Sequence, residues 1–273
     1  MSNLLPLYLK NHNVGKVHSK FTNGFNIQFD NFLIYVGRLG TPLTAFGLNI
    51  EEEKLKYLLN CVRSGDLVVN KGDKLIFYSG CGALTICYKD LEQIDLKLPE
   101  IKCTVKEISY SRIYQYLETI EFEKFIGIEL DEKTGKYIEL LLHSDKTAKN
   151  VNSMIINFFA GRGKGLTPSG DDILIGFTLA LMVFGQFNIW KNALTLEVTS
   201  DKTTLVSVAY LIALLAGYTS EHFIRLVKLV DNAESVALEK TINEVRSFGH
   251  TSGNDTLFGF FLGLKFLINQ GKE

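Results

Sequence analysis

Two long apolar stretches without a charged residue constrain the fold of this chain most strongly. Residues Ile173 to Trp190 contain no Asp, Glu, Lys or Arg, and neither do residues 203 to 220. Each stretch is about as long as the shortest helix that crosses a bilayer. Both contain glycine and polar residues, and both are flanked by acidic as well as basic side chains. We therefore expect buried helices of a bundle here, not membrane spans.

The two halves of the sequence differ in their periodicity. Short runs of β-branched and aromatic residues, separated by turn residues, predict strands within 25–37, 66–80 and 83–98. Helices are expected at 51–65 and 111–125, and a last strand at 136–144. After that point helical periodicity dominates, with helices expected at 144–161, 172–185, 201–217, 220–230, 235–249 and 255–268.

These patterns predict an α+β fold. We expect a β-rich N-terminal domain of residues 1–145, packed on a mainly helical C-terminal domain of residues 146–273. The formal net charge of −1 gives no basic surplus for nucleic acid. The four cysteines form no C-x-x-C pair and show no zinc-ligand spacing, and the N-terminus does not resemble a signal peptide. We therefore expect a cytoplasmic protein that binds neither membrane nor nucleic acid.

The helical half contains an internal repeat. Residues 168–181 and 251–264 are identical at eight of fourteen aligned positions, and both contain the pattern S-G-[DN]-D at a helix start. The matched positions of that pattern are Ser169 and Ser252, Gly170 and Gly253, Asp171 and Asn254, and Asp172 and Asp255. One interpretation is a pair of capping boxes, in which each serine caps a helix and the second acid returns a bond.

A glycine at equal depth in each repeat suggests a further role. Gly176 and Gly259 lie one turn into the two helices, and each costs about 1 kcal/mol relative to alanine. A close crossing of the two helices would explain both glycines. Such a crossing would bring the two helix starts together, with their unpaired N–H groups.

The residues before the first repeat indicate an anion site as the second interpretation. Glycines alternate with cations in Gly161-Arg-Gly-Lys-Gly165. Glycine lets the backbone approach a ligand, and cations complement an anion at a helix N-terminus. The spacing matches neither G-x-G-x-x-G nor a Walker A loop. A third helix start, at Thr203 and Thr204, can serve as a plain cap or join the site. The candidate anion- and substrate-binding residues are Arg162, Gly163, Lys164, Gly165, Thr167, Ser169, Gly170, Thr203, Thr204, Ser252, Gly253 and Asn254.

Three carboxylates would crowd this site if the two helices pair. Such acids are tolerated when one is protonated, when a cation lies between them, or when backbone N–H groups bind them. Asp172 and Asp255 are therefore candidates for acid–base chemistry, as is His250 beside the second motif. Asp171 with Asp172 is a candidate Mg²⁺ site. The sequence contains no G-x-S-x-G or H-E-x-x-H motif, so nothing indicates covalent catalysis.

Three motifs together resemble the AllH-like family. They are Gly165-Leu-Thr-Pro-Ser-Gly-Asp-Asp172, His250-Thr-Ser-Gly-Asn-Asp255 and Thr203-Thr204-x-x-Ser207. The namesake of that family is one subunit of an oxamate carbamoyltransferase, which works with FdrA-like and AllG-like partners in allantoin (purine) catabolism. Two positions depart from the family pattern. Lys164 stands where members often carry proline, and Asn254 stands where they often carry tryptophan.

The resemblance implies a transferase subunit of a hetero-oligomer that uses carbamoyl phosphate and a small carboxylate such as oxamate. Carbamoyl transfer requires a phosphate cradle and stabilisation of the carbonyl oxygen, which N–H donors and cations supply. No cofactor is implied beyond the candidate Mg²⁺. The alternative is a non-catalytic scaffold or small-anion-binding subunit whose partner carries the chemistry, so the enzymatic role of this chain stays open at this point.

Overall fold

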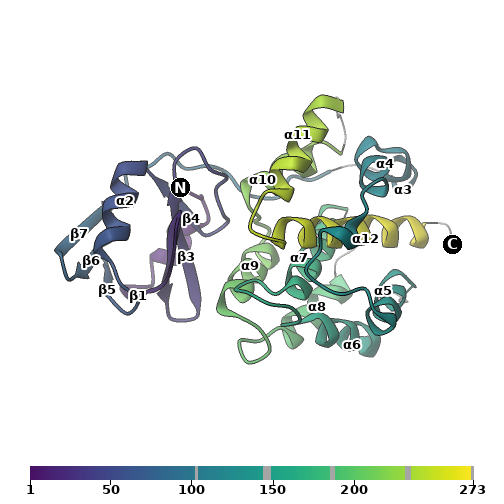
Figure 1. Cartoon of the computed structure of the whole chain (residues 1–273), viewed down its shortest axis with the longest axis horizontal. Helices are drawn as coiled ribbons and strands as arrows, with labels where there is room; N and C mark the ends of the chain where they lie inside the picture. Colours follow the sequence, from purple (N-terminus) through teal and green to yellow (C-terminus); the bar gives the residue numbers. More distant parts are fainter. Residues whose placement is uncertain (102–103, 144–148, 185–187, 231–234, 272–273) are drawn as a thin grey trace. The chain divides into compact units, whose positions relative to one another are not determined.

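The computed structural model describes residues 1–273 except 102–103, 144–148, 185–187, 231–234 and 272–273 (Figure 1). It confirms an α+β protein, with a seven-stranded sheet in the N-terminal part and helices in the C-terminal part. Two compact units are present. The first, here the sheet unit, contains Met1–Lys97 with Tyr218–Glu221, and the second, the helical unit, contains Leu98–Gly217 with His222–Glu273.

The sheet unit has strand order β4-β3-β2-β1-β5-β6-β7. All neighbouring strands are antiparallel except β3 and β4, which run parallel. The elements of this unit are α1 (Leu5–Leu9), β1 (Val14–Phe21), β2 (Gly24–Phe29), β3 (Phe32–Arg38), β4 (Gly47–Ile50), α2 (Glu52–Cys61), β5 (Leu67–Asn70), β6 (Lys74–Ser79) and β7 (Gly82–Cys87).

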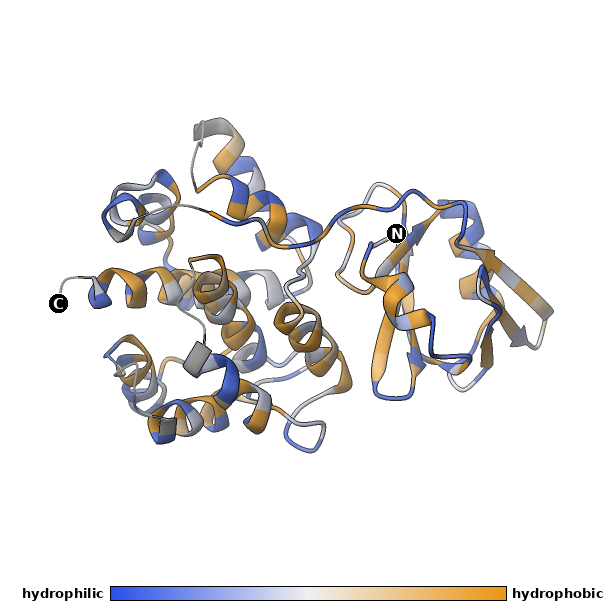
Figure 2. Ribbon diagram, turned by 180° about the vertical axis from the view of Figure 1, so that it is seen from behind, coloured by the Kyte–Doolittle hydropathy of each residue, from blue (hydrophilic) through white to orange (hydrophobic). Residues whose placement is uncertain are grey.

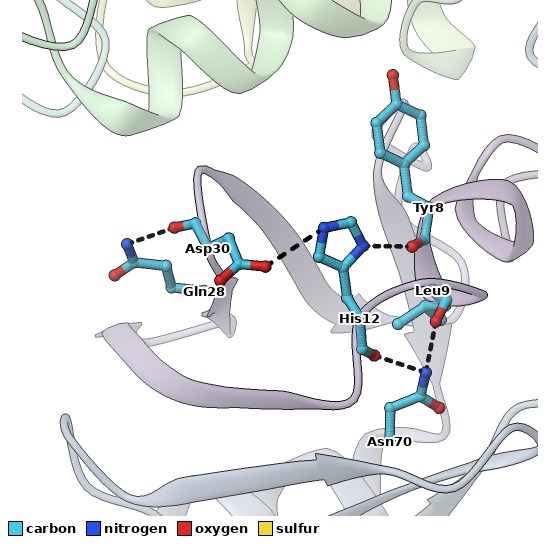
Figure 3. Close-up of polar contacts among 6 residues, drawn as sticks. All are labelled: Tyr8, Leu9, His12, Gln28, Asp30 and Asn70. Atoms are coloured by element: carbon cyan, nitrogen blue, oxygen red, sulfur yellow. Dashed lines mark hydrogen bonds and ion pairs between the residues drawn. The ribbon is translucent and has the colours of Figure 1, made fainter.

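A buried amide fastens the N-terminal segment to this sheet (Figure 3). The side-chain nitrogen of Asn70 donates to the carbonyl oxygens of Leu9, at 2.7 Å, and His12, at 2.9 Å. The His12 ring in turn contacts the Tyr8 carbonyl oxygen at 2.6 Å through Nδ1 and the Asp30 carboxylate at 3.4 Å through Nε2. Both N–H bonds of the Asn70 amide are thereby used, which fixes the C-terminal end of α1 to the last residue of β5.

The helical unit is built around α12, which runs through its middle (Figure 1). The surrounding helices carry both hydrophobic and hydrophilic stretches (Figure 2), as expected for helices with one face on a core. The elements of this unit are α3 (Val105–Tyr110), α4 (Arg112–Glu118), η1 (Phe122–Lys124), α5 (Glu132–His143), α6 (Lys149–Phe159), α7 (Ser169–Val183), α8 (Asn188–Glu197), α9 (Leu205–Leu215), α10 (Glu221–Lys228), α11 (Ser235–Arg246) and α12 (Ser252–Gln270).

The two repeated glycines lie at the crossing of α7 and α12, as the sequence predicted. A Cβ atom at Gly176 would lie 1.9 Å from the carbonyl oxygen of Thr256, and one at Gly259 would lie 2.1 Å from that of Ile173. Thr256 and Ile173 are themselves equivalent positions of the repeat. The glycine of each helix thus packs against the equivalent carbonyl oxygen of the other helix, and no larger residue fits at either position.

The order of the contacts shows that α7 and α12 run parallel. Asp172 lies beside Ser252 near the two helix starts. Two turns further on, a Cβ at Gly263 would lie 2.5 Å from the Cβ of Ala180. Both N-termini therefore lie at the same end of the pair.

Two of the expected elements are wrong. A strand was expected at 136–144, but the described residues of that range, 136–143, belong to α5, which buries Thr134 and Leu141 seven residues apart on one face. A short apolar run does not distinguish a strand from a buried helix. The helix expected at 111–125 is α4 followed by a turn and the short helix η1. The expected start of a helix at Ser144 lies outside the described residues.

The compact units divide at Lys97, whereas the sequence placed a domain boundary near residue 145. The difference arises because α3, α4 and α5 pack against α12. The chain also returns to the sheet unit at Tyr218–Glu221, where Glu221 and Leu43 exchange two hydrogen bonds of 2.8 and 3.0 Å. Among the described helices, none combines the length and the hydropathy needed to cross a bilayer.

Candidate functional site at two helix starts

The two repeated motifs begin the helices α7 and α12, but not as capping boxes. Pro168 and Thr251 are the N-cap residues, and neither makes a side-chain cap bond. Ser169 and Ser252 are the first residues inside their helices. The predicted reciprocal capping is therefore wrong, and the motif side chains are free for contacts between the two helices.

The motif glycines close an equivalent turn before each helix. Gly170 N–H donates to the Arg162 carbonyl oxygen at 2.8 Å, and Gly253 N–H donates to that of Phe248 at 2.9 Å. A Cβ at these glycines would lie only 2.1 and 1.9 Å from a backbone oxygen of the preceding segment. The repeat therefore extends to a helix–loop–helix unit, α6 to α7 and α11 to α12. Both glycine N–H groups are used within it.

Asp171 ties the first loop to the start of α9. Its Oδ1 accepts the N–H of Gly161 at 2.7 Å, and its Oδ2 accepts the hydroxyl of Thr203. The neighbouring Thr204 is the N-cap of α9, accepts the N–H of Ser207 at 3.1 Å, and donates its hydroxyl to the Leu166 carbonyl oxygen. Both threonine hydroxyls thus have protein partners, and both Asp171 oxygens are engaged.

No group of three or more His, Cys, Asp or Glu side chains suited to a metal occurs in the described residues. The expected Mg²⁺ pair depends on Asp171, whose two oxygens accept hydrogen bonds from Gly161 and Thr203. Each Asp171 oxygen thus has one of its lone pairs engaged by the protein.

Three glycines of the loop before α7 have positive φ values. Gly161, Gly163 and Gly165 have φ values of 70°, 118° and 99°, a region that side chains rarely adopt. Between them, the guanidinium of Arg162 stacks over the Phe158 ring at 4.0 Å, and Lys164 is exposed. The loop thus presents one cation to solvent and packs the other.

A buried pair of carboxyl groups lies where the two helix starts meet. Asp172 is 3% exposed and Asp255 is fully buried. Side-chain hydrogen bonds cross between the repeats. The Ser252 side chain hydrogen-bonds to Asp172, and the Ser169 side chain hydrogen-bonds to Asp255. Within the described part of the chain, the Oδ2 atoms of both acids are buried without a hydrogen-bond partner. Native structures rarely leave such atoms unpaired without a functional or solvent partner.

Burial raises the pKa of Asp172 well above its usual value, and the nearby charge of Asp255 raises it further. Hydrogen bonds from Ser252 and Thr167 act in the opposite direction on this pKa. Burial also raises the pKa of Asp255, although the N–H of Gly127 at 2.8 Å favours its ionised form. Two like charges in one buried site disfavour each other, so ionisation of one acid opposes ionisation of the other.

Sequence reasoning missed Gly127 and Thr251. Gly127 lies exposed between η1 and α5, and a Cβ there would lie 2.3 Å from Ser169 Oγ and 2.8 Å from Thr251 Oγ1. Its N–H also binds Asp255. The sequence signal for Gly127 was an isolated glycine between apolar residues, far from both motifs, whereas Thr251 lies within the second motif itself.

Asn254, a candidate substrate-binding residue, contacts Arg246 in the structure. Arg246 Nε donates to Asn254 Oδ1 at 3.0 Å, and the guanidinium stacks over the Phe125 ring at 4.4 Å. Asn254 thus plays in the second repeat the part that Asp171 plays in the first, which is to hold the preceding segment. His250 lies exposed on the loop before α12.

Fold and site together define a class of α+β protein with a duplicated helix–loop–helix unit. The second helix of each unit begins with Ser-Gly, and the two helix N-termini lie beside a buried pair of carboxyl groups. The family model described as oxamate carbamoyltransferase subunit AllH matches residues 159–264. This segment is less than half of the chain but includes both motifs. The match supports the resemblance to the AllH-like family that the motifs indicated, over this segment of the chain. No solved structure matches the chain closely enough for comparison.

Proposed function

We propose that this chain is a subunit of a carbamoyltransferase complex of the oxamate and oxalurate type. In this proposal the starts of α7 and α12 bind carbamoyl phosphate and the anionic acceptor. The observation that carries it is the convergence of the two motifs on one buried carboxyl pair, within the segment that matches a carbamoyltransferase subunit.

The parallel arrangement of the two helices favours an anion at this end. Each helix N-terminus carries a partial positive charge, and two that lie side by side add their effects. The N–H groups of Ser169 and Ser252 have no backbone acceptor among the described residues, and so are available to a phosphate or carbonyl oxygen. Preorganised donors of this kind stabilise the charge that develops on the oxygen during acyl transfer.

The loop before α7 supplies the cations for this proposal. Lys164 is exposed beside the motif, and Arg162 sits on Phe158 one residue before Gly163. A Cβ at Gly163 would lie 2.7 Å from the nitrogen of Ser169, so the loop backbone passes directly over the helix start. We expect Lys164 to attract the phosphate and the loop backbone to position it.

One observation favours the alternative of a non-catalytic scaffold or anion-binding subunit. Four of the expected anion donors, Gly170, Gly253, Thr203 and Thr204, donate to protein oxygens. Under this alternative the chemistry lies in an FdrA-like or AllG-like partner. Cytoplasmic location and a role in purine breakdown belong to the proposal in either case.

Turnover by the assembled complex, together with calorimetry of the full chain, separates the two. We expect Asp172→Ala and Ser169→Ala to abolish carbamoyl transfer while the variants still assemble, and the full chain to bind carbamoyl phosphate. Calorimetry with and without Mg²⁺ tests whether Asp171 and Asp172 bind the metal, since binding of carbamoyl phosphate would then depend on Mg²⁺. Active variants, or a chain that binds neither phosphate nor carbamoyl phosphate, would favour the scaffold.

A further inference from the structure

We infer that Asp172 and Asp255 form the subsite for the primary-amide end of the acceptor, and that the pair takes the proton which the amide nitrogen loses. This inference rests on the proposed function and deepens it. It divides the site into a donor-lined part for anionic oxygens and an acid-lined part for an N–H group.

The two unpartnered oxygens are the first step. Oδ2 of Asp172 and Oδ2 of Asp255 are buried and lack a partner among the described residues. The other contacts of the pair are taken by the chain itself, namely Gly127 N–H at Asp255 Oδ1 and the serine hydroxyls across the repeats. The chain thus satisfies one side of each carboxyl and leaves the other side for a ligand.

The charge of the pair decides which ligand fits. An anionic group at these oxygens would face one or two negative charges in a buried place. The resulting electrostatic repulsion exceeds the attraction that the helix N-termini offer an anion. A pair that holds one proton offers one acceptor and one O–H donor. A primary amide offers the complementary edge, an N–H donor beside a carbonyl acceptor.

The residues that border the carboxyl pair lie closer to the surface than the pair itself. Gly127 is exposed, and Thr167, Thr251 and Ser252 are half-buried. Gly127 has no side chain, and any Cβ there would overlap Ser169 Oγ and crowd Thr251 Oγ1. The backbone of Gly127 therefore packs directly against the hydroxyls of Ser169 and Thr251, which border the carboxyl pair.

The chemical step balances with these groups. The amide nitrogen attacks the carbonyl carbon of carbamoyl phosphate, and a C–N bond forms. The bond between that carbon and the phosphate oxygen breaks, and its electron pair leaves with inorganic phosphate. The proton lost by nitrogen passes to the ionised Oδ2 of the pair, which then carries two protons until one returns to solvent.

Calorimetry with three small carboxylates tests the subsite. Oxamate has the amide, oxalate replaces it with a second carboxylate, and N,N-dimethyloxamate keeps the carbonyl but has no N–H. We expect the full chain to bind oxamate roughly a hundredfold more tightly than either analogue, because sites built for an N–H reject ligands that lack it. The Asp172→Asn and Asp255→Asn variants should lose this preference, whereas the exposed-site control Asp201→Asn should keep it.

Carbamoyl phosphate is titrated in parallel so that the two proposals fail separately. Equal affinity for the three carboxylates, no oxamate binding, or a preference that survives both variants would overturn the subsite even if carbamoyl phosphate binds. Loss of carbamoyl phosphate binding in the wild-type chain would instead count against the proposed function. Urea unfolding of each variant shows that a lost preference does not come from a lost fold.

Discussion

Replacing Asp172 by asparagine should make the helical unit more stable, although it removes a group proposed to act in catalysis. The carboxyl is 3% exposed, and burial raises its pKa well above the usual value. In the unfolded chain the same group ionises near its ordinary pKa of about 3.9. Between these two pKa values the folded state holds a proton that the unfolded state has lost.

The sign of the pH dependence follows from this difference. Stability from the raised pKa is fully present below the unfolded pKa and declines as pH rises toward the folded pKa. Asparagine does not ionise, so the free energy of unfolding of the variant does not fall with rising pH for this reason. Each pKa unit of difference corresponds to about 1.4 kcal/mol, and leaving a buried polar group unpaired costs about 1–3 kcal/mol. We therefore expect Asp172→Asn to gain about 1–3 kcal/mol near pH 8 and much less near pH 4.

Urea unfolding between pH 4 and pH 8.5 measures this effect, with Asp201→Asn as the matched control because Asp201 is exposed. Above pH 5, the free energy of unfolding of the control should change with pH in the same way as that of the wild type. A variant that is less stable than the wild type at pH 8, or whose difference does not change with pH, would refute the account of the buried pair.

Three further predictions follow from the packing. Gly127→Ala should lower turnover of the complex by about tenfold or more, because its Cβ would overlap Ser169 Oγ; unchanged turnover in a steady-state assay would contradict this. Gly176→Ala should destabilise the chain by about 3 kcal/mol, since its Cβ would meet the Thr256 carbonyl oxygen. Thermal unfolding checks that value, and a melting temperature equal to the wild type would show that the crossing is looser than described. His222 is fully buried, and burial followed by the charge of Arg225 lowers its pKa to about 3. Its neutral form stabilises the fold above pH 6.5, and this contribution is lost as pH falls toward 3, so His222→Phe should flatten the loss of stability between pH 6 and pH 4 in urea titrations.

The helical core was largely predictable from the sequence because its signals are local. Gly176 and Gly259 cost helix propensity at matching positions, which made a close crossing the simplest explanation, and the structure confirms it. The alternating glycines from Gly161 to Gly165 were interpreted as letting the backbone approach a ligand, and the structure adds that all three have positive φ values.

The finer roles within the motifs were not predictable, since they depend on which neighbour each side chain meets. Asp171 and Asp172 are adjacent in sequence, yet one binds the loop and α9 and the other faces the second repeat. Gly127 is distant in sequence from both motifs, and only tertiary packing brings it to Asp255. The strand expected at 136–144 failed for the opposite reason, because a short apolar run fits a helix face equally well.

Turnover of carbamoyl phosphate and oxamate by the assembled complex carrying Asp172→Asn tests the central claim most directly. The account predicts a complex that assembles, unfolds at higher urea near pH 8, and has lost about a hundredfold or more of its kcat. A complex that keeps the kcat of the wild type would show that the chemistry lies outside the paired helix starts.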